Sequence, residues 1–226
     1  MNWAEHLKLK NSYKITIAAD GSAASGKTTG AKLISKKYGL KFLSSGLLYR
    51  YASYLLIRNN PPNKIQFLQK NFKILKLDKL NKLNLHSNKI SEYTSVIAKN
   101  KKIRNILKSF QINFAKKHRK VCIEGRDIGT VILPKADIKF FFKCDLNTAT
   151  KRRFKELKKT NKELKLIDIK KSLKIRNYRD ISRKNSPLLK SLDAIIVDTG
   201  KIKNIPDMII KMSETIERKV KDKYGS

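Results

Sequence analysis

The segment DGSAASGKT, residues 20–28, carries side chains and spacing suited to holding a chain of phosphates. Gly21, Gly26, Lys27 and Thr28 fit the pattern G-x-x-x-x-G-K-[ST], and the apolar run YKITIAA precedes them. Glycines let backbone N–H groups face phosphates at close range, the lysine reaches the β- and γ-phosphates, and the threonine hydroxyl binds Mg²⁺. We therefore expect a nucleoside triphosphate with magnesium on this loop, in contact with Gly21, Ser22, Ala23, Ala24, Ser25, Gly26, Lys27, Thr28 and Thr29.

Length and composition indicate one globular, cytoplasmic protein. The chain has 226 residues, of which 40% are hydrophobic, enough for one sizeable core. Its apolar runs are far shorter than the roughly 20 residues of a membrane span, and the first residues lack the apolar segment of a signal peptide. Cys122 and Cys144 are expected inside buried strands, and His6, His86 and His118 at the surface. None of these residues has the spacing of metal ligands.

The charge balance is extreme but evenly spread. Lys and Arg number 53 against 18 Asp and Glu, giving a formal charge of +35. No basic tail or cluster interleaved with aromatic residues stands out, and the abundance of Lys, Asn and Ile is what an A/T-biased coding sequence would give. Because diffuse charge attracts anions without selecting one, we expect no specific nucleic-acid partner and no membrane partner.

Apolar runs alternate with helical patterns along the chain, which predicts an α/β fold with a mostly parallel sheet. Ser87-Asn88 is expected to turn a small hairpin, and Thr160-Asn161 to separate two helices. The strands are expected at residues 13–19, 41–45, 120–124, 137–144 and 193–198, and the helices at residues 27–38, from 46 to the break at 59–62, 102–118, 147–184 in two parts, and from 205 onwards.

Three segments follow expected strands: GSAASGKT, SSGLLYR and EGRDIGT. In open parallel sheets, ligands bind at the carboxyl ends of the strands. We therefore expect these three loops to converge on one edge of the sheet.

Two common classes of phosphate-loop protein are disfavoured. A GTPase would need the guanine-binding sequence Asn-Lys-x-Asp, and no Asn-Lys pair in this chain is completed by Asp at the right place. A motor ATPase would usually add an apolar strand ending in Asp-Glu. Here the strand KVCIE is followed by Gly-Arg-Asp instead.

Three further segments, in order after the phosphate loop, resemble the bacterial cytidylate kinases. They are SSGLLYR at 44–50, EGRDIGTVILPKADIKFFF at 124–142 and RNYRDISRKNSPL at 176–188, and the resemblance extends over about residues 13–220. It implies a three-layer P-loop NTPase fold with a central parallel sheet, and we expect the protein to be a monomer. Residues 59–101 would be the insert that binds the nucleoside monophosphate, and residues 147–184 a helical lid.

The resemblance also implies a reaction and the residues that perform it. The γ-phosphoryl group of ATP would pass to CMP or dCMP, with Mg²⁺ as cofactor. The catalytic residues would be Lys27, Arg126, Arg176 and Arg183, and the lid would offer Arg152 and Arg153 to ATP. The CMP site would comprise Ser45, Tyr49, Arg50, Ser95, Arg104, Arg126, Asp127, Asp180 and Arg183.

The segment RNYRDISR has a pattern of its own. Arg176, Arg179, Asp180 and Arg183 fall at helical spacings of three, four and seven residues, hence on one face. Such a face could be a solvated set of ion pairs. It could equally clamp phosphates with guanidinium groups and accept a ribose hydroxyl on the carboxylate, as the resemblance implies.

Two departures from the family pattern concern the magnesium site and the insert. Ser44 stands where the family has Asp, so Glu124 or Asp20 would have to replace that carboxylate, or turnover would be slower. Only 45 positions separate Arg50 from Ser95, which indicates a shortened insert.

Two other functions stay open at this point. One is a kinase of the same fold acting on UMP or AMP. The other, supported by charge alone, is a nucleic-acid-binding ATPase.

Overall fold

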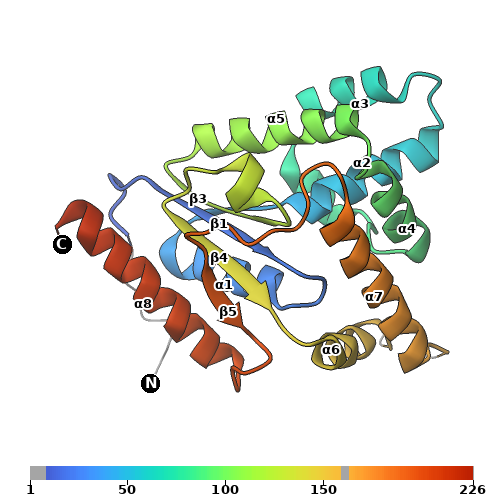
Figure 1. Ribbon diagram of the computed structural model, residues 1–226. Helices are drawn as coiled ribbons and strands as arrows, with labels where there is room; N and C mark the ends of the chain where they lie inside the picture. Colours follow the sequence, from blue (N-terminus) through green and yellow to red (C-terminus); the bar gives the residue numbers. More distant parts are fainter. Residues whose placement is uncertain (1–8, 159–162, 226) are drawn as a thin grey trace.

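The computed structural model describes residues 9–158 and 163–225, and it contains one five-stranded parallel sheet (Figure 1). The strands lie in the order β2-β3-β1-β4-β5, so the strand before the phosphate loop occupies the centre. The strands are β1 (Ile15–Gly21), β2 (Lys41–Ser44), β3 (Lys120–Gly125), β4 (Ile138–Lys143) and β5 (Ile195–Asp198).

Helices cover both faces of the sheet, as Figure 1 shows, and this gives the expected three layers. None of the helices in the described ranges is long and apolar enough to cross a membrane. The helices are α1 (Lys27–Tyr38), α2 (Ser45–Asn59), α3 (Lys64–Lys73), α4 (Asn88–Ile97), α5 (Lys101–Lys117), α6 (Leu146–Lys158), α7 (Leu166–Ser182) and α8 (Ile205–Tyr224), with two short segments, η1 (Leu77–Lys82) and η2 (Ile128–Ile132).

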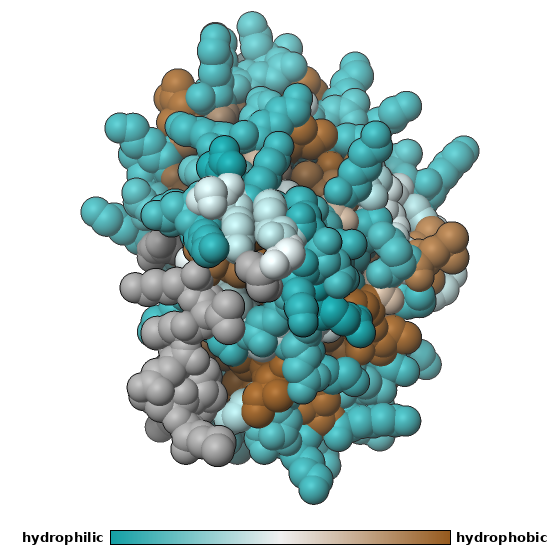
Figure 2. Space-filling view, turned by 90° about the vertical axis from the view of Figure 1, so that its left-hand side faces the viewer, coloured by the Kyte–Doolittle hydropathy of each residue, from teal (hydrophilic) through white to brown (hydrophobic). Residues whose placement is uncertain are grey.

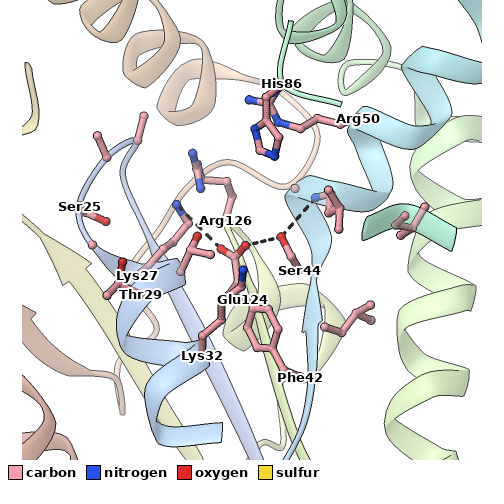
Figure 3. A pocket seen from close by; sticks show the side chains of 18 of the residues that line it. Ser25, Lys27, Thr29, Lys32, Phe42, Ser44, Arg50, His86, Glu124 and Arg126 are labelled. Carbon is pink, nitrogen blue, oxygen red and sulfur yellow. Dashed lines mark hydrogen bonds and ion pairs between the residues drawn. The ribbon is translucent and has the colours of Figure 1, made fainter. Parts of the chain in front are cut away.

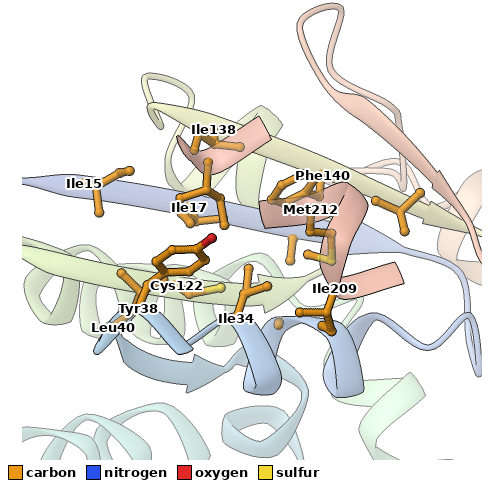
Figure 4. Packing of buried hydrophobic residues seen from close by; sticks show 14 of the residues in the cluster. Ile15, Ile17, Ile34, Tyr38, Leu40, Cys122, Ile138, Phe140, Ile209 and Met212 are labelled. Carbon is orange, nitrogen blue, oxygen red and sulfur yellow. The ribbon is translucent and has the colours of Figure 1, made fainter. Parts of the chain in front are cut away.

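The core is divided by the sheet because side chains of a strand alternate between its faces. Ile15 and Ile17 of β1 pack with Ile34 of α1 and Met212 of α8 on one face (Figure 4). Ala18, the residue after Ile17, packs on the other face with residues of α2 and α5. Strands buried on both faces read as near-continuous apolar runs, and this explains why the central strand β1 lies in the run YKITIAA.

Most of the predicted elements are confirmed, and α1 has the predicted bounds. It ends because Gly39 adopts φ 64°, a left-handed conformation that glycine enters without steric cost. The hairpin predicted at Ser87-Asn88 is wrong. Ser87 instead caps α4, its hydroxyl accepting from the N–H of Ile90 at 3.4 Å. Serine suits both turns and helix N-caps, so its presence could not distinguish the two.

The two cysteines differ in burial. Cys122 lies in β3 and is buried, as predicted, whereas Cys144 lies one residue beyond β4 and is half-buried. Both are free thiols. The turn predicted at Thr160-Asn161 and the position of His6 lie outside the described residues.

Candidate active site

The carboxyl ends of β1, β2 and β3 open onto one cavity of about 670 Å³ (Figure 3). The phosphate loop forms one wall, the β2–α2 junction the opposite wall, and the end of β3 the floor. Helices α6 and α7 add arginines from above. The predicted convergence of the three loops is thus confirmed. The ionic side chains around the cavity are Lys27, Lys32, Lys41, Arg50, Asp78, His86, Glu124, Arg126, Arg152, Arg153, Glu156 and Arg176.

The phosphate loop has the backbone conformation that its glycines allow. Gly21 has φ 154°, and a Cβ atom there would lie 2.2 Å from the carbonyl oxygen of Phe142. Gly26 has φ 80° and precedes α1 without any side-chain cap, so no side chain competes for the first N–H groups of the helix. Ala24 also adopts a positive φ, 56°. These conformations turn backbone N–H groups inward, which suits an anion at a helix N-terminus.

Lys27 is buried under this loop and points into the cavity. Its Nζ donates to the carbonyl oxygen of Ser22 at 3.2 Å and lies 4.0 Å from Oε2 of Glu124. Burial, and then the positive charge of Arg126, lowers the pKa of Lys27 to about 7. An ammonium group so poorly solvated gains strongly from an arriving phosphate.

Ser44, at the position where the family carries Asp, holds Glu124 in place. Its Oγ donates to Oε1 of Glu124 at 2.5 Å and accepts from the N–H of Leu47 at 3.2 Å, which caps α2. Glu124 faces the cavity. Asp20, the other proposed substitute, is turned away, because it accepts from the N–H groups of Ile128 at 2.8 Å and Gly129 at 2.7 Å. Burial raises the pKa of Asp20 to about 6.

Three arginines of the predicted catalytic and CMP-binding sets line the same cavity. Arg50 donates from Nη1 to the carbonyl oxygen of Leu85 at 3.0 Å and to Oγ of Ser91 at 2.8 Å. Arg126 donates from Nε to Oδ2 of Asp180 at 2.7 Å. Burial lowers the pKa of both Arg50 and Arg176 to about 10, with neighbouring guanidinium groups adding to the shift.

A second network joins residues predicted to bind the nucleoside. Asp127 is buried and pairs with Nη2 of Arg104, while Nη2 of Arg183 lies 3.8 Å from its other oxygen. Arg183 also lies 3.7 Å from Asp180. The guanidinium of Arg104 lies 5.8 Å from the ring centre of Tyr49, so these five residues form one continuous cluster.

Two predicted residues lie at the margins of these networks. Ser45 is the first residue of α2 and is buried beside the site. Ser95 lies on α4, one turn beyond the Ser91 hydroxyl that binds Arg50, and is half-buried. In the described part of the chain, Ser95 is not among the residues that line the 670 Å³ cavity.

Arg152 of α6 reaches the phosphate loop indirectly. It donates from Nη1 to Oγ1 of Thr199 at 2.8 Å and from Nη2 to the Thr199 carbonyl at 2.8 Å. Thr199 in turn donates to the carbonyl oxygen of Ser25 at 2.9 Å. Arg152 and Gly26 line a neighbouring cavity of about 330 Å³ as well. Arg153 lines the main cavity and pairs with Glu156 at 2.8 Å.

The shared face predicted for the arginines of α7 is partly wrong. Arg176 and Asp180 face the site, but Arg179 is exposed and lines a separate surface cavity of about 650 Å³. Arg183 lies just beyond the end of α7, in extended backbone, and still returns to Asp127. At about 100° per residue, Arg179 lies roughly 60° around the helix from Arg176 and roughly 100° from Asp180, so only part of the predicted face turns toward the site.

Three residues around the site had no signal in the sequence. His86, expected merely at the surface, is exposed yet lines the main cavity (Figure 3). Thr199 links Arg152 to the phosphate loop. Asn177 accepts from the N–H of Ala23 at 3.0 Å and so joins α7 to that loop. His86 and Thr199 lie outside the quoted segments, and Asn177 lies within RNYRDISR but was assigned no role there. Only the fold brings the three near the site.

Comparison with known proteins assigns the family. The sequence profile of the family described as "Cytidylate kinase" matches residues 17–218. The chain belongs to the cytidylate kinase family. A protein named cytidylate kinase from Rickettsia canadensis is 37% identical over 195 residues, covering 86% of this chain and 88% of that protein. One of the same name from Bartonella tribocorum is 39% identical, covering 82% and 87% respectively.

The family assignment agrees with the architecture. An uncharacterized protein from Eubacterium ventriosum has a crystal structure similar to this fold, with a TM-score of 0.51, 18% identity, and coverage of 89% of this chain and 99% of that one. At this identity the likeness concerns the fold alone. The Bartonella and Rickettsia relatives supply the family, and the cavity geometry supplies the chemistry.

Proposed function

We propose that this protein transfers the γ-phosphoryl group of ATP to CMP or dCMP, giving the diphosphate and ADP. The observation that carries the proposal is the buried Asp127, held by Arg104 and Arg183 beside a cavity lined with cations. A carboxylate accepts a hydrogen bond from the exocyclic amine of cytosine, whereas uracil would present a carbonyl oxygen and be repelled. The membership of the chain in the cytidylate kinase family supports the same reaction.

The acceptor would lie across the two networks. Arg50, Arg126 and Arg176 would bind its phosphate in the main cavity, and Asp180 its ribose. To admit the base, Asp127 must exchange part of its pairing with Arg104 or Arg183 for the cytosine amine. We propose Tyr49, Ser45 and Ser95 as the packing and hydrogen-bonding edge of that base site.

The transfer needs little proton chemistry, because the attacking phosphate oxygen is already anionic. Catalysis then consists of holding two phosphate groups in line and neutralising the charge between them. Lys27 would do this from the phosphate loop, and Arg126, Arg176 and Arg183 from the opposite side. No general base is required, and Glu124 is not assigned that role.

Magnesium is implied by the family, and the residues present fit it. Among the described residues, no group of three His, Cys, Asp or Glu could hold a metal by itself. Thr28 lines the cavity and offers one hydroxyl, and Glu124 offers one fixed carboxylate. Mg²⁺ commonly uses one or two protein oxygens with phosphates and water, so this set suffices when nucleotide is bound. The ion would bridge phosphate oxygens and neutralise their charge.

The donor base is proposed to lie in the neighbouring 330 Å³ cavity. Gly26 and Thr29 of the phosphate loop border this cavity, as do Arg152 and Ile205. A flat guanidinium and apolar side chains suit a purine ring. In this arrangement Arg152 would contact the base side of ATP, and Arg153 the phosphates.

Two segments are proposed to move. Residues 147–184 would close as a lid over ATP and exclude water, which would otherwise accept the phosphoryl group. Residues 59–101 would close over the monophosphate, carrying the segment that binds Arg50.

A coupled assay that measures ADP with CMP, dCMP, UMP, AMP and GMP tests the proposal. We expect CMP and dCMP to be the best acceptors by kcat/KM. Preference for UMP or AMP would replace the assignment with another monophosphate kinase. ATP turnover stimulated by RNA or DNA and indifferent to CMP would contradict it altogether.

A further inference from the structure

We infer that His86 is a further ligand for the phosphate group of the acceptor nucleotide. The inference rests on the proposed function, because it takes the acceptor to be a nucleoside monophosphate bound at Arg50. It concerns a residue that no motif of the chain includes.

The position of His86 is fixed through its neighbour. The carbonyl oxygen of Leu85, itself fully buried, accepts from Nη1 of Arg50 at 3.0 Å, and Ser91 accepts from the same nitrogen at 2.8 Å. The segment that carries His86 is therefore attached to the arginine proposed to hold the phosphate. Figure 3 shows the imidazole next to the Arg50 guanidinium, on the side that faces Arg126. All three side chains line one cavity.

The charged groups that face His86 are mostly cations. Arg50 comes from α2, Lys32 from α1, and Arg153 with Glu156 from α6. Partial burial first, and then the charge of Arg50, lowers the pKa of His86 below its ordinary value. The imidazole is therefore neutral in the free protein near pH 7. A neutral imidazole avoids adding one more uncompensated charge to this cluster.

An arriving phosphate reverses that balance. A phosphate monoester carries about −1.5 to −2 charges at pH 7. Placed between Arg50 and Arg126, it would favour the imidazolium, which then donates a charge-assisted hydrogen bond to a phosphate oxygen. The proton comes from solvent, so binding of the acceptor takes up a proton at His86. The expected consequence is tighter acceptor binding at lower pH.

The direct test follows the imidazole by NMR. The His86 Cε1–H resonance, assigned with His86→Gln, is titrated with pH in the free protein, with CMP, and with cytidine, which lacks the phosphate. We expect CMP to raise the His86 pKa by about one unit or more, and cytidine to leave it unchanged. His118 is the internal control, since it packs edge-on against Phe114 at 4.7 Å and does not line the cavity. An unchanged pKa with CMP overturns the inference.

Kinetics provide the second measurement. The KM for CMP is compared between the wild type, His86→Gln and the control His118→Gln from pH 6 to 8.5. The phosphate of CMP titrates in the same way with every variant, so its effect cancels in the ratio of the variant KM to the wild-type KM. For His86→Gln we expect KM to rise about fivefold at pH 6 and to approach the wild-type value by pH 8.5, with kcat within about twofold. A ratio that does not change with pH would mean that His86 acts without titrating, and would overturn the inference.

These outcomes are separable from the proposed function. If the protein prefers UMP, the base assignment fails, yet UMP should still raise the His86 pKa because it carries the same phosphate. If ATP raises that pKa and no monophosphate does, His86 belongs to the donor side and the inference fails while the kinase assignment stands.

Discussion

The donor half and the acceptor half of the site are built in opposite ways. The donor half is a run of nine consecutive residues from the end of β1 to the start of α1, shaped by Gly21 and Gly26 and completed by Lys27. The acceptor half is assembled from α2, the insert, the end of β3 and the end of α7. The donor half is also open, whereas Asp127 of the acceptor half is occupied by two guanidinium groups.

This contrast indicates different functions for the charges. In the donor loop the single ammonium of Lys27 is poorly compensated, as suits the proposed phosphate. In the acceptor half the carboxylates and guanidiniums neutralise one another, and the proposed nucleoside would replace one partner. A buried charge left without a partner is costly, so such pairing keeps the empty site stable.

The largest effect is expected from the donor half, for Lys27→Met. The variant removes the one cation that the phosphate loop aims into the cavity, and we expect kcat to fall by about 10³-fold. Its circular dichroism spectrum should match the wild type, because Lys27 carries a charge that burial disfavours. The control is Lys32→Met, an exposed lysine on the same cavity. Equal losses in the two variants would refute the special position of Lys27.

The acceptor half is tested by Asp127→Asn. An amide can either accept from cytosine or donate to uracil, so we expect the preference for CMP over UMP to fall by about 100-fold while ATP binding is unchanged. Initial rates with both acceptors measure this. The control is Asp193→Asn, which breaks an ion pair with Lys139 away from the cavity. Discrimination that survives intact in Asp127→Asn would sink the base assignment.

A smaller effect is expected where the halves meet, at Ser44. Ser44→Ala removes the hydrogen bond to Glu124 and the cap of α2, and should lower the unfolding free energy by about 1 kcal/mol. We also expect the Mg²⁺ concentration for half-maximal rate to rise between about three- and tenfold, since Glu124 loses its orientation. Ser44→Thr keeps the hydroxyl and serves as the control. If both variants need the same Mg²⁺ as the wild type, Glu124 has no part in the metal site.

The smallest expected effect is the uptake of less than one proton when ATP binds. With a pKa of about 7, Lys27 is neutral in about nine of ten free molecules at pH 8 and largely charged at pH 6. ATP phosphates favour the charged form, so binding should take up close to one proton at pH 8 and little at pH 6. Calorimetry in buffers of different ionisation enthalpy measures the uptake. Lys27→Met should abolish it, and persistence in that variant would assign the proton elsewhere.

The two halves also differ in how much of their structure the sequence predicts. The phosphate loop, its strand and its helix were predictable because they are local, and α1 has the predicted bounds. The insert was the least well predicted part. The sequence LNLHSNKIS suited a hairpin, yet α4 starts there because its apolar side, with Ile90 and Ile97, is buried by packing. Propensity alone does not determine a segment that derives its order from tertiary contacts.

The sequence by itself determined the nucleotide loop, the α/β alternation and the motif residues, since each depends on neighbours within a few positions. It also carried the family resemblance that the comparisons confirmed. Only the tertiary structure decided which side chains meet. It turned Asp20 to η2 and Glu124 to the cavity, left Arg179 outside, and brought His86 beside Arg50. Such choices depend on packing between segments far apart in the chain, and no spacing along the sequence encodes them.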